Sequence, residues 1–170
     1  MIKTIITLLG GFLLIESTES ASSPPQIPNN SIDKIVVYKT KRQLELRCND
    51  RIIKTYRIAL GKNPIGHKQR QGDYKTPEGI YKISGKNPNS KFHKSLRISY
   101  PNEQDLLCAQ ENCVHPGGDV MIHGLDKKSS WIGKAHANRD WTQGCIAVSN
   151  DEIEEIYSAT KTGAVIQINA

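Results

Sequence analysis

Short stretches of alternating apolar and polar residues make up most of the first half of the chain. The segments 35–38, 44–48 and 52–60 are separated by polar turns, and 44–48 alternates strictly between apolar and polar positions. Such alternation is typical of strands with one buried face, and short turns favour antiparallel neighbours. We therefore expect these three strands to form an antiparallel meander.

The pattern continues as further short strands, with room for helices between them. Pro101 ends one such strand, and a short helix is expected at 102–110. The expected strands are 80–83, 96–100, 120–122 and 165–168, with a turn at 85–90.

One helix is predicted near the C-terminus by its cap and its spacing. Ser149 and Glu152 form the Ser-x-x-Glu pattern of a capping box. Ile153, Ile156 and Tyr157 follow at helical spacing, and Gly163 stands where such a helix is expected to stop. The chain is therefore expected to be mainly β, with one C-terminal helix and short helices in loops.

The N-terminus has the organisation of a secretory signal peptide. Lys3 precedes an apolar run at 5–15, which is followed by small and polar residues at 16–23. The run of about 11 residues is shorter than the ~20 that span a bilayer, although an uncleaved anchor is the alternative. We expect a signal peptide at 1–21, a linker rich in Ser, Pro and Asn at 22–31, and one domain at 32–170.

Composition narrows the class of protein less than the N-terminus does. The chain has 170 residues, of which 37% are hydrophobic, enough for the core of a single domain. Its formal net charge of +6 indicates an anionic partner. Charge alone leaves nucleic acid, acidic lipid and a carboxylate-rich wall polymer open.

Four cysteines, Cys48, Cys108, Cys113 and Cys145, lie in the part expected to be exported. An oxidising compartment favours disulfides, and four cysteines allow three pairings. If Cys145 is a nucleophile it must stay free, which favours a short Cys108–Cys113 bridge and an unpaired Cys48. A zinc site at Cys108, Cys113 and His115 is a weaker alternative, because no second cysteine pair accompanies it.

A histidine and a cysteine, each beside a glycine, form the candidate chemistry. His123 ends an apolar run before Gly124, and Cys145 follows Gly144. An imidazole can deprotonate a thiol, its second nitrogen needs an orienting acceptor, and a glycine lets the backbone turn to present amides. From these residues alone, a structural cysteine and an unrelated histidine remain the alternative.

The wider pattern resembles the YkuD-type L,D-transpeptidase family. His123-Gly124 follows a strand, and Thr142-Gln143-Gly144-Cys145-Ile146 comes further along the chain. The likeness covers essentially the whole chain after its N-terminal segment. It extends through 33–38, 60–64, 72–81, 92–102, 116–119, 140–150 and 152–157.

The resemblance implies a cysteine enzyme of bacterial peptidoglycan with a β-sandwich or barrel-like catalytic domain. Cys145 would attack the bond after the L-centre of meso-diaminopimelate in a tetrapeptide stem and release D-alanine. The acyl-enzyme would pass to an amine of another stem, giving a 3-3 cross-link, or to water. His123 would be the base, the carbonyl of Gly124 its orienter, and the amides of Gly144 and Cys145 part of the oxyanion hole. No metal or organic cofactor is expected.

Two positions depart from the usual family pattern. Many members carry His where this chain has Gln143, and Arg or Asn where it has Ala147. Arg139 is the candidate replacement, because a guanidinium can bind a stem carboxylate with two hydrogen bonds; a solvated surface cation is the alternative. Trp141 is either part of the cleft or a core filler. The expected substrate-binding set is Arg139, Thr142, Gln143, Trp141 and His136.

Other functions on the same fold stay open at this point. The alternatives are an L,D-carboxypeptidase, a hydrolase that releases a wall-linked lipoprotein, and a non-catalytic wall-binding module, against which the intact His123 and Cys145 argue. The expected partners are peptidoglycan stem peptides, with a wall-linked lipoprotein as a further candidate, and not nucleic acid. The mature protein is expected to be wall-associated, without a stable membrane span, and periplasmic in a cell with two membranes, where it would serve wall biogenesis and cell shape.

Overall fold

The computed structural model describes residues 26–170, so the expected signal peptide and the start of the expected linker lie outside the described residues. One sheet organises this part, with strand order β3-β2-β1-β8-β4-β5-β6-β7. Its strands are β1 (Ile32–Tyr38), β2 (Gln43–Cys48), β3 (Arg51–Arg57), β4 (Gly79–Ser90), β5 (His93–Ile98), β6 (Met121–His123), β7 (Ile146–Ala147) and β8 (Thr160–Asn169).

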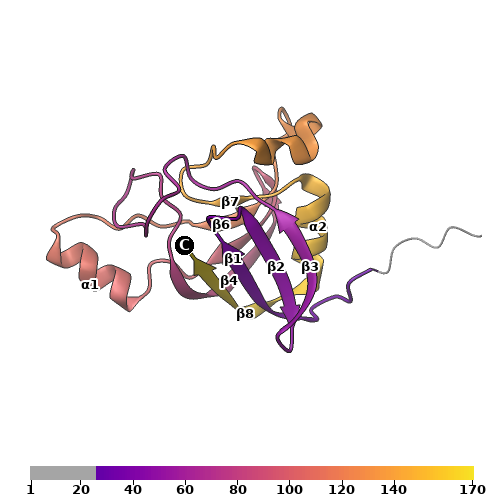
Figure 1. The fold of residues 1–170 in the computed structure, drawn as a ribbon, viewed down its shortest axis with the longest axis horizontal. Helices are drawn as coiled ribbons and strands as arrows, with labels where there is room; N and C mark the ends of the chain where they lie inside the picture. The colour runs from indigo at the N-terminus through magenta and orange to yellow at the C-terminus, as the bar shows by residue number, and fades with distance from the viewer. Residues whose placement is uncertain (1–25) are drawn as a thin grey trace, which may run out of the picture.

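The sheet curls until its two ends approach each other. Strands β1, β2 and β3 form the expected antiparallel meander. Strand β8 then lies parallel to β1 and antiparallel to β4, which joins the C-terminus to the middle of the sheet. Ala59, just after β3, exchanges backbone hydrogen bonds of 3.0 and 2.9 Å with Ala147 in β7. The expected mainly β, barrel-like fold is thereby confirmed (Figure 1).

The concave side of the sheet holds the hydrophobic core. Strands contribute alternate residues to it, because successive side chains point to opposite faces. Helix α2 (Asn150–Ala159) adds Ile153 and Ile156, both fully buried. Other members include Ile35, Val37, Leu44, Leu46, Ile83, Leu96, Ile122, Ile146, Ile166 and Ile168.

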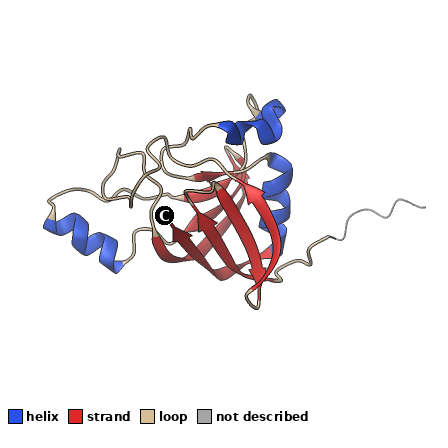
Figure 2. Cartoon of the chain, viewed as in Figure 1, coloured by secondary structure: helices blue, strands red, loops and turns tan. Residues whose placement is uncertain are grey.

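Three helical segments lie outside the sheet (Figure 2). Helix α1 (Glu103–Glu111) begins at an Asn102–Asp105 capping box and stands away from the sheet, whereas α2 begins at the expected Ser149–Glu152 box. Segment η1 (Ser130–Asn138) is a 3₁₀ helix. The long loops gather at the end of the sheet where β6 and β7 lie (Figure 1).

Within residues 26–170, no helix combines the length and the apolar character that crossing a membrane requires.

Two boundary predictions were wrong. Residues 85–90 belong to β4 and not to a turn, because β4 continues to pair with β5 through register shifts after Ile83 and after Asn87. Helix α2 ends at Ala159, well before Gly163, because Thr160 adopts extended backbone and enters β8. Pairing with one neighbouring strand, β5 for the end of β4 and β1 for the start of β8, outweighs the local turn and stop signals.

The favoured Cys108–Cys113 bridge is also absent, since all four cysteines are free. Cys108 lies in α1, and its carbonyl accepts the amide of Asn112 at 3.2 Å. Cys113 follows with a φ of 53°, and its amide donates to Gln110 at 3.0 Å. The backbone here is therefore positioned by the end of the helix, without a disulfide.

Candidate active site

Two short parallel strands bring the expected base and nucleophile to one face of the sheet. In the β6–β7 register, Ile122 is opposite Ile146 and His123 is opposite Ala147. Ile122 and Ile146 point into the core, so His123 and Cys145 point to the outer face. Cys145 lies two residues before the partner of His123, a diagonal of roughly 8 Å between backbones from the rise and spacing of strands.

The imidazole of His123 is held in one orientation and one tautomer. Its Nδ1 lies 2.7 Å from the carbonyl oxygen of Gly124, which can only accept a hydrogen bond, so Nδ1 carries the proton. Nε2 is then left with a lone pair, as a base requires. Burial lowers the pKa of His123 to about 4, so the ring is neutral at pH 7. The carbonyl of Gly124 therefore orients the ring and leaves Nε2 as an acceptor.

Aromatic side chains enclose the same imidazole. The ring of Phe92 lies against it with centroids 4.5 Å apart, and Trp141 approaches edge-on at 5.8 Å. The indole Nε1 of Trp141 donates to Nδ1 of His136 at 3.4 Å, and His136 is itself buried. Trp141, expected either in the cleft or as a core filler, therefore packs against His123, and His136 packs against Trp141.

Gly124 is required by the close packing of helix α2. A Cβ at this position would lie 2.6 Å from Oδ1 of Asn150 and 2.9 Å from Cγ2 of Ile153. The same Asn150 oxygen accepts the amide of Leu125 at 2.7 Å. The peptide that orients His123 is therefore fixed by the first turn of α2.

The thiol of Cys145 is partly buried and protonated. It donates to the main-chain carbonyl of Asp119, 3.6 Å away. Burial raises the pKa of the Cys145 thiol above its ordinary value, and the carboxylate of Asp119 acts in the same direction, whereas the charge of Lys68 opposes it. The resting site therefore holds a neutral thiol and a neutral imidazole.

The turn that presents Cys145 depends on Gly144 and Thr142. Gly144 has a φ of 131°, and a Cβ there would lie 2.7 Å from the carbonyl oxygen of Lys75. The hydroxyl of Thr142 donates to the carbonyl of Cys145 at 2.7 Å and accepts the amide of Gly144 at 3.1 Å. The amide of Gly144 can therefore join an oxyanion hole only if Thr142 releases it.

An ion pair that the sequence did not reveal anchors this turn to the β1–β2 connection. The guanidinium of Arg42 binds Asp140 through Nη2 at 2.7 Å and through Nε at 3.0 Å. Asp140 also accepts the amide of Leu60 at 2.9 Å, and the carbonyl of Leu60 accepts the amide of Thr142 at 3.1 Å. The sequence shows only that an acid, Asp140, stands next to the cysteine motif, because its partner Arg42 lies 98 positions away.

The buried side chain of Lys39 holds the segment between β3 and β4 in place. Lys39 is 2% exposed, and its ammonium donates to the carbonyls of Gly66 and Thr76 at 2.7 and 2.9 Å and to Glu78 at 2.8 Å. Burial lowers the pKa of Lys39 despite the charge of Glu78. This segment packs on Gly144, so Lys39 also supports the turn that presents Cys145.

Two expected substrate-binding residues remain solvent-exposed. Arg139 and Gln143 form no side-chain hydrogen bond or ion pair with any part of residues 26–170. Both lie on the segment that leads into the nucleophile turn, so they are free to contact a ligand. The described residues also contain no group of three or more His, Cys, Asp or Glu side chains that could hold a metal ion.

Comparison with known proteins gives a match to one family of catalytic domains. A sequence model of the L,D-transpeptidase catalytic domain, YkuD, matches residues 32–168. The putative L,D-transpeptidase YafK of Escherichia coli strain K12 is 32% identical over 138 residues, which are 78% of this chain and 48% of YafK. The chain thus spans about half the length of the curated relatives it matches.

Solved structures with the same fold include one from Campylobacter jejuni and one from Bdellovibrio bacteriovorus. The helical cell shape determining protein Pgp2 of Campylobacter jejuni is 23% identical, with a TM-score of 0.64 over 86% of this chain and 52% of Pgp2. Bd1075 of Bdellovibrio bacteriovorus is 26% identical, with a TM-score of 0.57 over 83% of this chain and 48% of Bd1075. From the matched domain and the YafK relatives, this chain belongs to the YkuD family of L,D-transpeptidase catalytic domains.

Proposed function

We propose that this protein is a peptidoglycan L,D-transpeptidase that forms an acyl-enzyme on Cys145 with a tetrapeptide stem. One observation carries the proposal. The imidazole of His123 is held by the carbonyl of Gly124 with Nε2 left as an acceptor, and the parallel strands β6 and β7 put Cys145 on the same face. A positioned base beside a thiol is the arrangement that nucleophilic acyl transfer requires.

The first half-reaction begins with the neutral pair. The thiol turns away from Asp119 toward His123, and Nε2 takes its proton as sulfur attacks the carbonyl carbon of the L-centre of meso-diaminopimelate. The amide of Cys145 donates to the developing oxyanion. The tetrahedral intermediate then collapses: the carbon–nitrogen bond breaks, and the imidazolium returns its proton to the amine of the departing D-alanine.

The second half-reaction uses the same base on the acceptor. An amine of a second stem attacks the thioester and loses a proton to Nε2 of His123. The carbon–sulfur bond breaks, and the thiolate recovers the proton from His123. When water is the acceptor the product is a tripeptide, which would make the same protein an L,D-carboxypeptidase; a wall-linked lipoprotein would be released by the corresponding hydrolysis.

Arg139 is proposed to bind a carboxylate of the donor stem. Its guanidinium is exposed and precedes Asp140, whose carboxylate is already used by Arg42. The proposal therefore relies on a cation that no intramolecular acid neutralises among residues 26–170. Thr142 is assigned a positioning role, because its hydroxyl joins Gly144 to Cys145.

Export is part of the same proposal. The substrate lies outside the cytoplasm, and the sequence at 1–21 has the organisation of a signal peptide. A periplasmic, wall-associated location in a cell with two membranes, and a role in wall cross-linking and cell shape, follow from the substrate.

Incubation of the mature chain with defined muropeptides, followed by mass spectrometry, tests the proposal. Loss of D-alanine with a cross-linked dimer is the expected result, and the C145A variant should give neither. Mass addition by a carbapenem, blocked by prior alkylation of the thiol, should locate the nucleophile at Cys145. Full turnover by C145A would refute the mechanism, and tripeptide without dimer would assign hydrolysis.

A further inference from the structure

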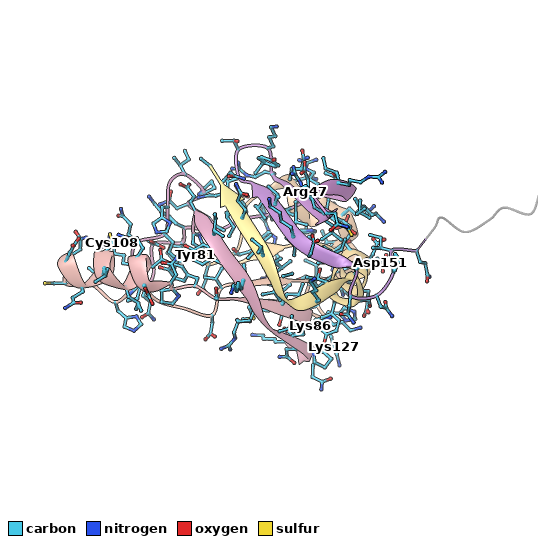
Figure 3. All side chains as sticks on the ribbon, turned by 90° about the horizontal axis from the view of Figure 1, so that it is seen from below. Arg47, Tyr81, Lys86, Cys108, Lys127 and Asp151 are labelled. Atoms are coloured by element: carbon cyan, nitrogen blue, oxygen red, sulfur yellow. The ribbon has the colours of Figure 1, made fainter. Side chains whose placement is uncertain are left out.

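A hollow of about 410 Å³ lies where the β4–β5 hairpin meets the segment after β6 and the first residue of α2. Its size is in the usual range of ligand sites, about 300–1,000 Å³. Lys127, one of its residues, lies at the end of the molecule opposite α1 and Cys108 (Figure 3). Its lining contains no carboxylate and consists of Pro88, Asn89, Ser90, Lys91, His93, Leu125, Lys127, Ser130 and Asn150.

The lining offers hydrogen-bond donors and free positive charge. Lys91 and Lys127 are exposed, and neither forms an ion pair within residues 26–170. The carbonyl oxygen of the Asn150 side chain is occupied by the amide of Leu125, so its NH₂ group is the part left to bind a ligand. His93 is paired with Glu154 at 2.6 Å. The nearest acid along the chain, Asp126, accepts the amide of Ser129 at 2.8 Å.

A second hollow, on α2, shows that positive charge does not line every hollow of the molecule. It measures about 370 Å³ and is lined by Asp151, Glu154 and Glu155, with no lysine or arginine. The two hollows are of similar size and share one helix, yet their charges are opposite. The cationic lining of the first is therefore not a simple consequence of the net charge of +6.

Residues that line the cationic hollow are next in sequence to residues that surround His123. Phe92, whose neighbours Lys91 and His93 line the hollow, stacks on the ring of His123. Leu125 lines it as well and follows His123 by two residues, roughly 7 Å of extended chain. The thiol, by contrast, lies toward Asp119, at the other end of β6.

This placement fits the needs of the second half-reaction. The acyl group occupies Cys145 when the acceptor arrives, and the acceptor amine must reach Nε2 of His123 to lose its proton. The acceptor therefore has to come from the His123 end of the site. A stem peptide bears carboxylates, and the unpaired lysines at this end have the complementary charge.

We propose that the hollow lined by Lys91, Lys127 and Asn150 binds a carboxylate of the acceptor stem peptide. The inference rests on the proposed transpeptidase function and adds a binding site for its second substrate. It assigns a separate cationic site to each stem. Arg139 binds the donor on the Cys145 side, and the two lysines bind the acceptor on the His123 side.

The test measures cross-linking against acceptor concentration at a fixed, saturating donor tetrapeptide. The acceptors are a tripeptide stem with free carboxylates and the same stem with its carboxylates amidated, leaving the amine unchanged. The K91Q/K127Q variant should raise the apparent KM for the free acceptor roughly tenfold, which corresponds to about 1.4 kcal/mol and lies within the range expected for two exposed ion pairs. Its maximal rate at saturating acceptor should change much less.

Two matched variants and the amidated stem complete the experiment. K91R/K127R keeps both charges and should keep the wild-type KM. K82Q/K161Q removes two exposed lysines elsewhere and should behave as wild type. For the amidated stem, wild type and K91Q/K127Q should share one raised KM, because the charge pairing is already lost.

The possible results distinguish failure of the acceptor site from failure of the proposed transpeptidase function. An equal KM for wild type and K91Q/K127Q with the free acceptor overturns the acceptor site, and so does an equal loss in K82Q/K161Q. D-alanine release by wild type without any dimer also overturns it, while the donor half of the proposed function stands. Absence of D-alanine release from wild type refutes the proposed function itself.

Discussion

The proposed base, His123, and the proposed nucleophile, Cys145, are held in place by different means. His123 is 2% exposed and packs against two aromatic side chains, Phe92 and Trp141, while helix α2 packs against its neighbour Gly124. Cys145 is less buried and stands on a turn whose position depends on hydrogen bonds from Thr142 and on the Arg42–Asp140 pair.

The difference indicates which half of the site can move. The imidazole is held by Phe92, Trp141 and the carbonyl of Gly124, whereas the thiol can rotate about one side-chain bond. The neutral resting pair fits this division, because the thiol needs to meet the base only when substrate is bound. In the proposed mechanism, the site thus combines a fixed base with an adjustable nucleophile.

Removing either the thiol of Cys145 or the imidazole of His123 should have the largest effect on the rate, and the two losses should be similar. C145A and H123A should each lower the rate of D-alanine release by about 10⁴-fold or more, because nucleophile and base act as a unit. The double variant should be no slower than the slower single variant. Rates of the three proteins on one tetrapeptide decide this, and additive losses would show independent roles.

The buried neutral base should make stability depend on pH. The pKa of His123 is about 4 in the folded protein and near 6.5 in the unfolded chain, so the unfolded chain binds more protons between these values. Stability should therefore fall as the pH is lowered from 6.5 to 4, by up to about 3 kcal/mol. Urea unfolding of wild type and H123Q should show a smaller fall in H123Q; equal slopes would mean that His123 is not buried in neutral form.

A methyl group added at Gly124 should lower the free energy of unfolding more than loss of the Thr142 hydroxyl does. G124A places a Cβ 2.6 Å from Asn150, and such overpacking costs about 1–3 kcal/mol. T142V keeps the shape of Thr142 but removes the hydrogen bonds to Gly144 and Cys145, so it should cost activity more than stability. Thermal unfolding and kcat of both variants provide the comparison, and the reverse ranking would contradict the proposed division.

The ion pair under the nucleophile turn should affect turnover more than binding. D140N weakens the contact with Arg42 and should lower kcat by about tenfold, within the cost of breaking a partly buried pair. The KM for the donor should change little, because neither side chain is assigned to substrate. A conservative R42K variant should retain more activity than R42A; identical losses would indicate that the charge has no part in placing Cys145.

Arg139 should give the smallest of these effects. An exposed charge pair with substrate contributes about 1 kcal/mol or less, so R139A should raise the donor KM by up to about fivefold and leave the free energy of unfolding unchanged. The K161A variant, which removes an exposed cation on β8, is the matched control. A normal KM for R139A would remove Arg139 from the donor site.

Much of the fold follows from local patterns in the sequence. The alternating segments from 35 to 60 predicted the antiparallel meander, and the Ser149–Glu152 capping box predicted the start of α2. Strand ends were less predictable, because the extension of β4 to Ser90 and the early start of β8 depend on pairing with distant strands. The freedom of Cys108 and Cys113 likewise depends on the backbone at the end of α1.

The sequence by itself determined the chemical identity of the site: a histidine before a glycine and a cysteine after one, with the Thr142 motif that carries the family resemblance. Tertiary structure decided how these groups are held. The neutral state of His123 comes from burial, its tautomer from one carbonyl, and the placement of Cys145 from an Arg42–Asp140 pair across 98 positions. Such properties depend on distances through space, which no local sequence pattern encodes.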